Sequence, residues 1–368
     1  MDSSQLSIDG MLRTSRAIAN KFLRSTVKAG EIVYALRGKL GEVRLVPPEL
    51  DGANLTQGTA RLAPKENIDP IYLLWSLRED NFLKRSELEA KGSTFREITL
   101  ADLRRLTIPV PPPKEQAQIA TTLSEIDSLI SSLDQLIAKK RDIQQAAMQQ
   151  LLTGQRRLPG FCGEWEVRRL GDHLSFLRNG TNSRAELLAE GEIRYLHYGD
   201  IHGSQHLLLN PTKTSMPCLP HEKAKRLDRL ENGDLIFADA SEDMDGVGKS
   251  VEVQGLEGVD LVAGLHTIAL RLDKNILADG FKAYLQFIPE FRAHLRQLAA
   301  GTKVYATNRV HIASAEIKTP GIEEQTAIAA VLSDMDAELA ELEARRDKSR
   351  QLKQGMMQEL LTGRIRLV

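Results

Sequence analysis

The stretch MQQLLTGQRRLPGF (Met148–Phe161) decides the architecture of this chain, because nearly the same letters return as MMQELLTGRIRLV at Met356–Val368. A displacement of 209 residues also places the EQ pair at 115–116 on the EQ pair at 324–325. The match needs no gap from there to Leu158, and it includes LSEID over LSDMD. An ungapped match of this length indicates an internal duplication, so the chain is predicted to hold two copies of one structural unit.

The duplication extends upstream with a different displacement. AGEIVYA at 29–35 matches NGDLIFA at 232–238 when the chain is shifted by 203 residues. If Gly30 corresponds to Gly233, then Met1 corresponds to position 204. We therefore expect the first domain to be N-terminally incomplete, without the counterpart of roughly residues 161–203.

The matched segments carry the signals of two long helices. Prolines followed by acidic residues precede each one, and Gly154 and Gly363 stand where a glycine would end it. Apolar residues recur with alternating spacings of four and three, a heptad pattern that requires a partner helix. The predicted coiled-coil seam consists of Ile119, Leu123, Ile126, Ile130, Leu133, Ile137, Ile328, Leu332, Met335, Leu339 and Leu342. We expect helices of about 38 residues that pair with each other, antiparallel and within one chain.

The regions before the helices mix strand and helix patterns. GEIVYAL at 30–36 and GDLIFAD at 233–239 are short, apolar and β-rich, whereas 69–90 and 279–300 are predicted to be amphipathic helices. The fold class is therefore α+β, with two α/β domains and two long helices. The predicted boundaries are 1–111 for the first α/β domain, 112–160 for the central helix, 161–319 for the second α/β domain and 320–368 for the distal helix.

Composition indicates an ordinary globular chain. Hydrophobic residues make up 42%, charged residues 27%, and the formal net charge is −1. The N-terminus has no apolar signal-peptide core, and the apolar runs are too short for a membrane span. Two cysteines, Cys162 and Cys218, cannot form a disulfide framework. We expect a cytoplasmic protein with reduced thiols and no membrane partner.

Two motifs invite a catalytic or metal-binding interpretation that their details do not favour. GVGKS at 246–250 ends like a phosphate-binding loop, but Asp243 stands where the pattern needs glycine. His197, His202, His206 and Asp200 have no metal-ligand spacing, so no metal is predicted. No nucleophile elbow or dinucleotide turn is present either, and the chain is expected not to be an enzyme.

Equivalent segments precede the two long helices, GSTFREIT at 92–99 and GTKVYATN at 301–308. A glycine followed by a hydroxyl side chain suits contacts to phosphate, and neighbouring Arg96, Lys303 and Arg309 add positive charge. A tight turn that leads into a strand explains the same residues equally well.

Taken together, these motifs resemble the conserved regions of the specificity subunits of type I restriction-modification systems. An EQ pair after a proline, an LS-[DE]-x-D segment and LLTG recur together in both copies. The resemblance implies two target-recognition domains for double-stranded DNA and two helices that set their spacing and bind methyltransferase subunits. A restriction (translocase) subunit would join the complex. S-adenosylmethionine, ATP and Mg would be cofactors of those partners, and the chain itself would hold none.

Under this resemblance the DNA contacts are expected in loops of both α/β domains. The candidates are Asn179, Asn182, Arg184, Tyr198, Lys249, Lys303, Tyr305 and Arg309 in the second domain, and Arg37, Lys39, Thr94 and Arg96 in the first. Two alternatives stay open: a coiled-coil scaffold whose α/β domains bind protein, and an orphan or defective specificity cassette. Self-association of the chain is a further open alternative.

Overall fold

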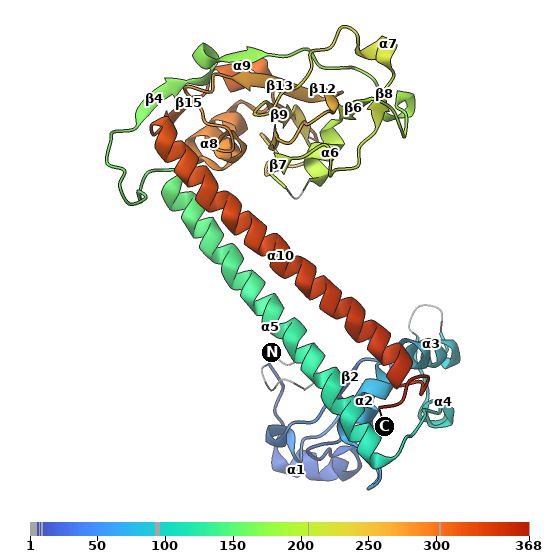
Figure 1. The fold of residues 1–368 in the computed structure, drawn as a ribbon. Coiled ribbons are helices and arrows are strands. Elements are labelled where there is room, and N and C mark those ends of the chain that lie inside the picture. The colour runs from blue at the N-terminus through green and yellow to red at the C-terminus, as the bar shows by residue number, and fades with distance from the viewer. Residues whose placement is uncertain are drawn as a thin grey trace. The chain divides into compact units, whose positions relative to one another are not determined.

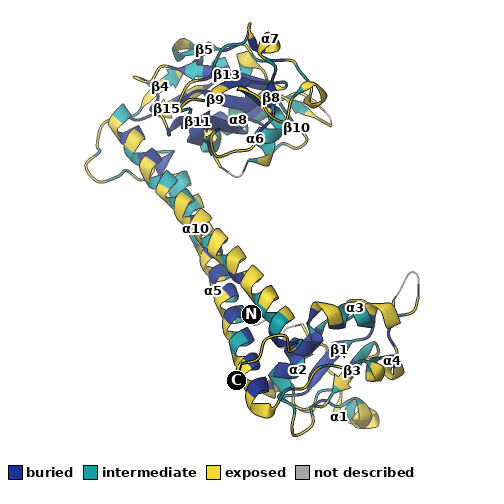
Figure 2. Cartoon of the chain, turned by 45° about the vertical axis from the view of Figure 1, so that its right-hand side comes forward, coloured by how far each residue is buried: buried dark blue, intermediate teal, exposed yellow. Residues whose placement is uncertain are grey.

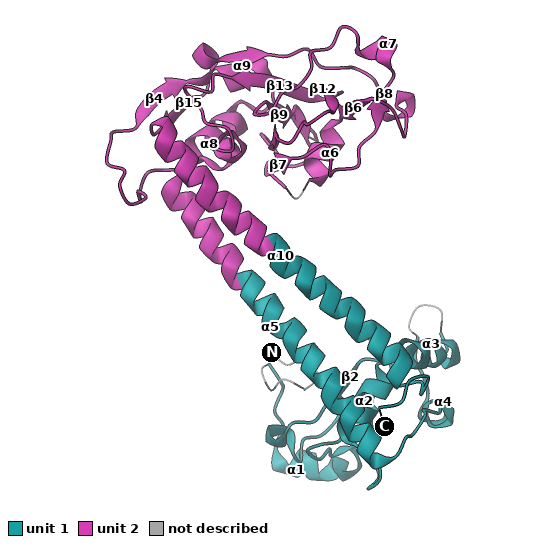
Figure 3. Cartoon of the chain, viewed as in Figure 1, with its two compact units in different colours: residues 1–138, 340–368 teal, residues 139–339 magenta. Residues whose placement is uncertain are grey.

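The computed structural model describes residues 6, 8, 10–92, 96–204, 206–301 and 303–367. Figure 1 shows the order of helices and strands along the chain. The chain forms two compact units, residues 1–138 with 340–368 (unit 1) and residues 139–339 (unit 2), which Figure 3 distinguishes by colour. Each unit combines one α/β domain with part of each long helix.

The two long helices are α5 (Pro113–Leu151) and α10 (Ile322–Leu360), and each has 39 residues. Both of their bounds differ by 209 positions, as the repeat predicts. Beyond their ends, Gly154 and Gly363 adopt φ angles of 70° and 75°, the left-handed conformation that closes a helix at little cost only for glycine. The predicted helix lengths and helix ends are confirmed.

In unit 1 the two helices pair through apolar and charged contacts. Arg366 donates to both carboxylate oxygens of Glu115, and Lys353 Nζ lies 2.5 Å from Asp127 Oδ1. Arg350 Nη2 lies 3.0 Å from Asp134. Partner numbers fall on one helix as they rise on the other, so the helices are antiparallel. The α5 seam is buried throughout unit 1: Ile119, Leu123, Ile126, Ile130, Leu133 and Ile137.

In unit 2 the start of α10 pairs with the end of α5, whereas in unit 1 the start of α5 pairs with the end of α10. Arg157 donates to both carboxylate oxygens of Glu324, with N–O distances of 2.5 Å, and Gln144 Nε2 lies 2.6 Å from Asp336. Ile328, Leu332 and Leu339 are buried, whereas Met335 here and Leu342 in unit 1 are half-buried. The intramolecular antiparallel pair predicted from the heptads is thus present within each unit.

The repeated EQ pair joins each helix start to its α/β domain. Gln116 and Gln325 are fully buried, and each side-chain amide accepts one hydrogen bond and donates two. The partners are the N–H of Asp69 and the carbonyls of Asn67 and Pro111 for Gln116, and the N–H of Ala278 and the carbonyls of Ile276 and Pro320 for Gln325. These buried backbone groups need partners, which explains why glutamine recurs at both positions.

The α/β domain of unit 1 contains a three-stranded antiparallel sheet of order β2-β1-β3. Its elements are α1 (Arg16–Ala19), η1 (Asn20–Ser25), β1 (Ile32–Ala35), β2 (Val43–Leu45), η2 (Pro48–Leu50), β3 (Thr59–Leu62), α2 (Pro70–Leu77), α3 (Asp80–Glu89) and α4 (Leu100–Arg105). Ile32, Tyr34 and Leu74 are fully buried in the core. Helix α2 begins where the Asp69 carboxylate accepts from two backbone N–H groups.

The α/β domain of unit 2 is larger. A five-stranded sheet has the order β5-β13-β9-β11-β7, and a three-stranded sheet has the order β12-β6-β8. The strands are β4 (Glu166–Arg169), β5 (Leu174–Phe176), β6 (Ile193–Leu196), β7 (Leu208–Leu209), β8 (Cys218–Leu219), β9 (Leu235–Ala238), β10 (Ala240–Ser241), β11 (Ser250–Val253), β12 (Asp260–Ala263), β13 (Thr267–Leu272), β14 (Tyr305–Ala306) and β15 (Glu316–Thr319). The helices and 3-10 turns are η3 (Leu170–His173), η4 (Arg184–Glu186), α6 (Tyr198–Gly203), α7 (His221–Ala224), η5 (Lys282–Phe287), α8 (Pro289–Leu298) and α9 (Arg309–Ala313). The central strands are buried along their length (Figure 2).

The central strands of the two copies correspond. Strand β9 lies between β13 and β11 as β1 lies between β3 and β2. An acidic residue before the central strand pairs with an arginine of the neighbouring strand in both: Asp234 with Arg271, and Glu31 with Arg61. Within the described residues, β5 and β7 extend the sheet of unit 2 on both sides, and unit 1 has no counterpart of these strands.

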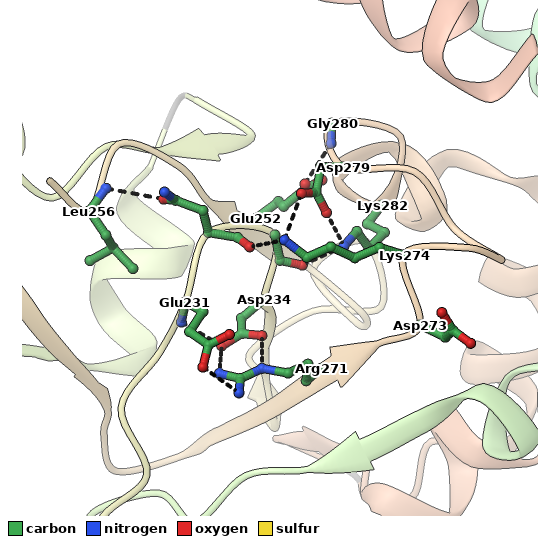
Figure 4. A network of polar contacts seen from close by, with 12 residues as sticks. Glu231, Asp234, Glu252, Leu256, Arg271, Asp273, Lys274, Asp279, Gly280 and Lys282 are labelled. Atoms are coloured by element: carbon green, nitrogen blue, oxygen red, sulfur yellow. Dashed lines mark hydrogen bonds and ion pairs between the residues drawn. The ribbon is translucent and has the colours of Figure 1, made fainter. Parts of the chain in front are cut away.

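A polar network lies inside unit 2 beside β9 and β11 (Figure 4). Lys282 is fully buried, and its Nζ donates to Asp279 at 2.6 Å and to the carbonyl of Gly233 at 2.7 Å. The carboxylate of Glu252 accepts from the N–H groups of Gly280 and Ala283. These contacts hold the turn before β9 against the segment that leads into η5.

Two segments that the sequence predicts as single helices are each divided. Residues 69–90 form α2 and α3, because the Glu79 carboxylate accepts the N–H of Phe82 and starts a new helix. Residues 279–300 form η5 and α8, because Pro289 excludes a helical conformation at the residue before it. The amphipathic period continues across both breaks, and this is why the sequence pattern misses them.

Candidate nucleic-acid interface

The turn between β12 and β13 in unit 2 is the point on which several predicted site residues converge. At this turn His266 has a φ of 56°, the one non-glycine residue with positive φ in the described part of the chain. The phenolic oxygen of Tyr195 holds the turn by accepting the N–H of Leu265 at 2.8 Å and donating to the carbonyl of Asn182 at 2.9 Å. The turn is thus bonded to the loop that carries Asn182.

Asn179 and Arg309 lie together on one side of this turn. The Asn179 side chain donates to the carbonyl of Gly264 at 3.3 Å and accepts from Arg309 Nη2 at 3.3 Å. Arg309 also donates to the carbonyl of Leu177 at 3.0 Å, and its guanidinium lies 5.3 Å from the centre of the Phe176 ring. Arg309 is exposed, so its charge is held in place and is still open to a ligand.

Asn182 and Arg184 belong to a charged loop next to the start of α6. Arg184 Nη2 lies 2.6 Å from Asp200, and the same carboxylate accepts the N–H of His197 and caps α6. Asn182 donates to Glu186 at 3.0 Å. Hydrogen bonds from Lys223, then from Ser183 and Asn182, lower the pKa of Glu186 to about 2, so this carboxylate stays ionised.

A cavity of 510 Å³ opens beside the turn. Its lining residues are Tyr198, His202, Ala240, Ser241, Glu242, Asp243, His266 and Val304. The ring of Tyr198 packs edge-on against His266, with 5.4 Å between ring centres, and against His202 at 6.1 Å. The cavity therefore combines flat aromatic surfaces with carboxylate and hydroxyl oxygens.

Lys249 and Tyr305 adjoin the cavity through its lining residues. Lys249 Nζ donates to the carbonyl of His202 at 2.7 Å, and burial lowers the pKa of this ammonium. Tyr305 pairs with Ser241 where β14 meets β10. Lys303 is exposed and lies two residues before Tyr305 in the chain.

Seven of the eight candidates of the second domain are thus connected to the β12–β13 turn or to this cavity: Asn179, Asn182, Arg184, Tyr198, Lys249, Tyr305 and Arg309. Lys303 is exposed, and it is placed only by its neighbours in the chain. The fold brings together positions from four separate segments of the chain, some of them in loops and others in short helices or strands, and the sequence could not have shown their proximity.

In unit 1 three of the four candidates are described, and all three are exposed: Arg37, Lys39 and Arg96. Arg37 forms a backbone bridge with Glu97, so the loop after β1 and the segment before α4 lie next to each other. Lys39 Nζ lies 3.9 Å from Glu42. Thr94 lies outside the described residues.

His266, which lines the cavity, and Asp239, which contacts it, were missed by sequence reasoning. His266 Nδ1 lies 3.2 Å from Asp239 Oδ1, although 27 positions separate them in the chain. Asp239 directly follows β9 and His266 directly precedes β13. A position next to a strand is only a weak indication of a functional residue. No motif joins a histidine and an aspartate at this spacing, so only the tertiary structure reveals the pair.

Two negative findings apply to the described part of the chain. Within it, no group of three or more His, Cys, Asp or Glu side chains has a geometry that could hold a metal ion. No helix within it is long and apolar enough to cross a membrane. Cys162 is exposed, Cys218 is buried, and both are free thiols.

Comparison with known proteins gives concordant results. Residues 10–139 match the family described as type I restriction modification DNA specificity domain. The type I restriction enzyme MjaVIII specificity subunit of Methanocaldococcus jannaschii is 24% identical, over 95% of this chain and 84% of that protein. The putative type I restriction enzyme MjaX specificity subunit of the same organism is 25% identical, over 83% of this chain and 71% of that protein.

A solved structure shares the fold. The crystal structure of the type I restriction-modification system S subunit from M. genitalium aligns with a TM-score of 0.60 at 16% identity, covering 91% of this chain and 83% of the other. The chain is thus similar to type I restriction-modification specificity subunits, by the family match over residues 10–139 and by relatives of 24–25% identity that align over most of its length.

Proposed function

We propose that this chain recognises a sequence in double-stranded DNA and directs the methyltransferase subunits of a type I restriction-modification complex to it. The observation that carries the proposal is the convergence of seven candidate residues on the β12–β13 turn and its cavity. Similarity to known proteins supports the same role, because the relatives that align over most of the chain are specificity subunits.

The exposed cations around the turn suit phosphate. Arg309, Arg184 and Lys303 are exposed, and the first two are held by hydrogen bonds or an ion pair. Arginine and lysine contacts to phosphate orient a protein on duplex DNA and make its affinity depend on salt. Aromatic and hydroxyl groups of the cavity supply the directional contacts that base edges require.

The methylation and cleavage chemistry is assigned in this proposal to partner subunits. S-adenosylmethionine, ATP and Mg would be bound by the methyltransferase and restriction subunits. The paired helices α5 and α10 would provide the surface on which the methyltransferase subunits bind. This assembly would act on DNA in the cytoplasm.

Binding to duplex DNA at several salt concentrations tests the proposal. We expect the chain, assembled with its methyltransferase subunits, to bind random duplex DNA more weakly as salt rises, with a linear relation between the logarithms of affinity and salt concentration. No binding at low salt would contradict the proposal and favour a protein-binding scaffold.

Methylome sequencing of cells that carry or lack the gene, with the cognate methyltransferase present, identifies the target. We expect an adenine-methylation motif that disappears with the gene. An unchanged methylome would favour a defective specificity cassette.

A further inference from the structure

The cavity beside the β12–β13 turn has a chemistry different from that of its surroundings. Its lining includes the carboxylates of Glu242 and Asp243, the hydroxyl of Ser241 and two imidazoles, but no lysine or arginine. Carboxylates repel phosphate, so the cavity does not suit the DNA backbone. A group that offers hydrogen-bond donors fits it better.

We propose that this cavity binds the exocyclic amino group of a cytosine or an adenine in the major groove, with His266 as the residue that determines specificity. The proposal rests on the proposed function, since it requires that unit 2 bind duplex DNA. Among the groups at the major-groove edge, cytosine N4 and adenine N6 are the hydrogen-bond donors, whereas guanine and thymine present acceptors.

The negative charge of the Asp239 carboxylate lies next to one ring nitrogen of His266, although the two atoms are not aligned for a hydrogen bond. Asp239 Oδ1 lies 3.2 Å from His266 Nδ1 and favours the proton on that nitrogen. Nε2 of the neutral ring then carries a lone pair and accepts a hydrogen bond. The His266 side chain is 52% exposed, so this acceptor is accessible from the cavity.

His202 is the second imidazole that lines the cavity, and its hydrogen bond fixes the proton on the other ring nitrogen. Its Nε2 lies 2.8 Å from the carbonyl of Ala240, which is an acceptor, so the proton of the neutral ring is on Nε2. The Tyr198 ring contacts both imidazoles edge-on. This packing limits the rotation of His266 and gives its acceptor a defined direction.

The backbone of His266 supports a functional role. A φ of 56° is costly for a side chain that carries a Cβ, and it persists only where the surroundings hold it. Here the carbonyl of His266 accepts the N–H of Asp239 at 3.1 Å, which joins the turn to the end of β9. A glycine would adopt this conformation at a lower cost.

Two substitutions test the proposal without disturbing the turn. His266→Gly removes the ring and tolerates the positive φ, and His266→Asn also tolerates it while shortening the side chain. His221→Ala is the matched control, because His221 is an exposed histidine of α7 that does not line the cavity. Circular dichroism and thermal unfolding verify that each variant folds.

The chain is assembled with its methyltransferase subunits and used to select sites from a random duplex library. We expect the unaltered complex and His221→Ala to enrich the same motif. In His266→Gly and His266→Asn, discrimination at one cytosine or adenine position is expected to fall about tenfold or more, while the remaining positions stay specified.

The amino group itself is then removed from the DNA. Replacing the cytosine by 2-pyrimidinone, or the adenine by purine, is expected to weaken binding of the unaltered complex about tenfold and to leave His266→Gly unaffected. If both histidine variants keep every motif position and the same sensitivity to loss of the amino group, this inference is wrong and the proposed function stands. If the unaltered complex selects no sequence, the proposed function itself fails.

Discussion

At the scale of single residues, Glu252 is a buried carboxyl group whose pKa is shifted by its surroundings. It is fully buried on β11, and burial raises its pKa from 4.5 to about 7, against the lowering effect of two backbone N–H groups and Lys282. The protonated form is therefore favoured in the folded state relative to the unfolded state. We therefore expect the stability of unit 2 to depend on pH.

The first prediction concerns that dependence. Because the folded pKa is above the unfolded one, the contribution of Glu252 to stability is complete below pH 4.5 and is lost as pH rises to about 7. At 1.36 kcal/mol per pKa unit, the loss amounts to about 3 kcal/mol. Urea unfolding of the full chain across this pH range measures it.

Glu252→Gln should remove most of this slope, because glutamine does not titrate. Glu257→Gln, at an exposed glutamate of the same domain, should keep it. An equal slope in Glu252→Gln and in the unaltered chain would show that another group is responsible.

The second prediction concerns Arg309. Its guanidinium is exposed and held by the carbonyl of Leu177 and the side chain of Asn179. Under the proposed function it contacts phosphate, so Arg309→Ala should weaken binding to all duplex sequences alike and lower the salt slope by about one. Affinity measured at several salt concentrations tests this expectation. A loss confined to one base position would instead place Arg309 at a base edge.

At the scale of elements, the junction between each long helix and its α/β domain depends on one buried glutamine. The side-chain amides of Gln116 and Gln325 bond to three backbone groups each, at equivalent positions of the two copies. Apolar residues cannot make these bonds. The helix start and the preceding domain are therefore coupled by hydrogen bonding as well as by apolar contact.

The third prediction follows from these bonds. Gln325→Leu leaves three backbone groups without partners, and an unsatisfied buried group costs about 1–3 kcal/mol. We expect a loss of about 3 kcal/mol or more in the stability of unit 2, and the same loss in unit 1 for Gln116→Leu. Chemical denaturation measures both losses. Gln118→Leu, at an exposed position of α5, is the control and should change stability by less than about 0.5 kcal/mol.

At the scale of the whole molecule, the duplication makes two related but unequal units. The sheet around β9 in unit 2 has five strands, the corresponding sheet around β1 in unit 1 has three within the described residues, and the loop residues differ between copies. Under the proposed function, two unequal recognition domains in one chain specify an asymmetric site. An identical pair, in contrast, would specify a symmetric one.

The fourth prediction concerns that asymmetry. His266→Gly changes unit 2 alone, so it should relax one part of the methylated motif and leave the other part intact. Methylome sequencing of cells that carry this variant compares the two parts directly. Relaxation of both parts together would contradict independent recognition by the two units.

Most of the helical architecture was predictable from the sequence, because its signals are local. The spacing of Ile119, Leu123 and Ile126 predicts a buried seam, and Gly154 predicts a helix end, since the left-handed conformation favours glycine. The breaks at Glu79 and before Pro289 were missed. At both breaks the amphipathic period continues in the sequence. The helix nevertheless ends, because of a capping side chain at one break and a proline at the other.

The candidate site was predictable only as a set of residue types. Polar, basic and aromatic residues in loops pointed to Asn179, Tyr198 and Arg309, yet nothing in the sequence placed them around one turn. The pair formed by His266 and Asp239 was not predicted at all. Its importance lies in a positive φ and a 3.2 Å contact, and neither has a sequence signature.

The sequence by itself determined the duplication, the two 39-residue helices, their apolar seam and their ends, because each depends on periodicity or on residues that are close in the chain. The tertiary structure decided which side chains meet. Arg157 reaches Glu324 across 167 positions, and Arg366 reaches Glu115 across 251. Such contacts depend on how folded elements pack against each other, and residue spacing along a chain carries no record of that packing.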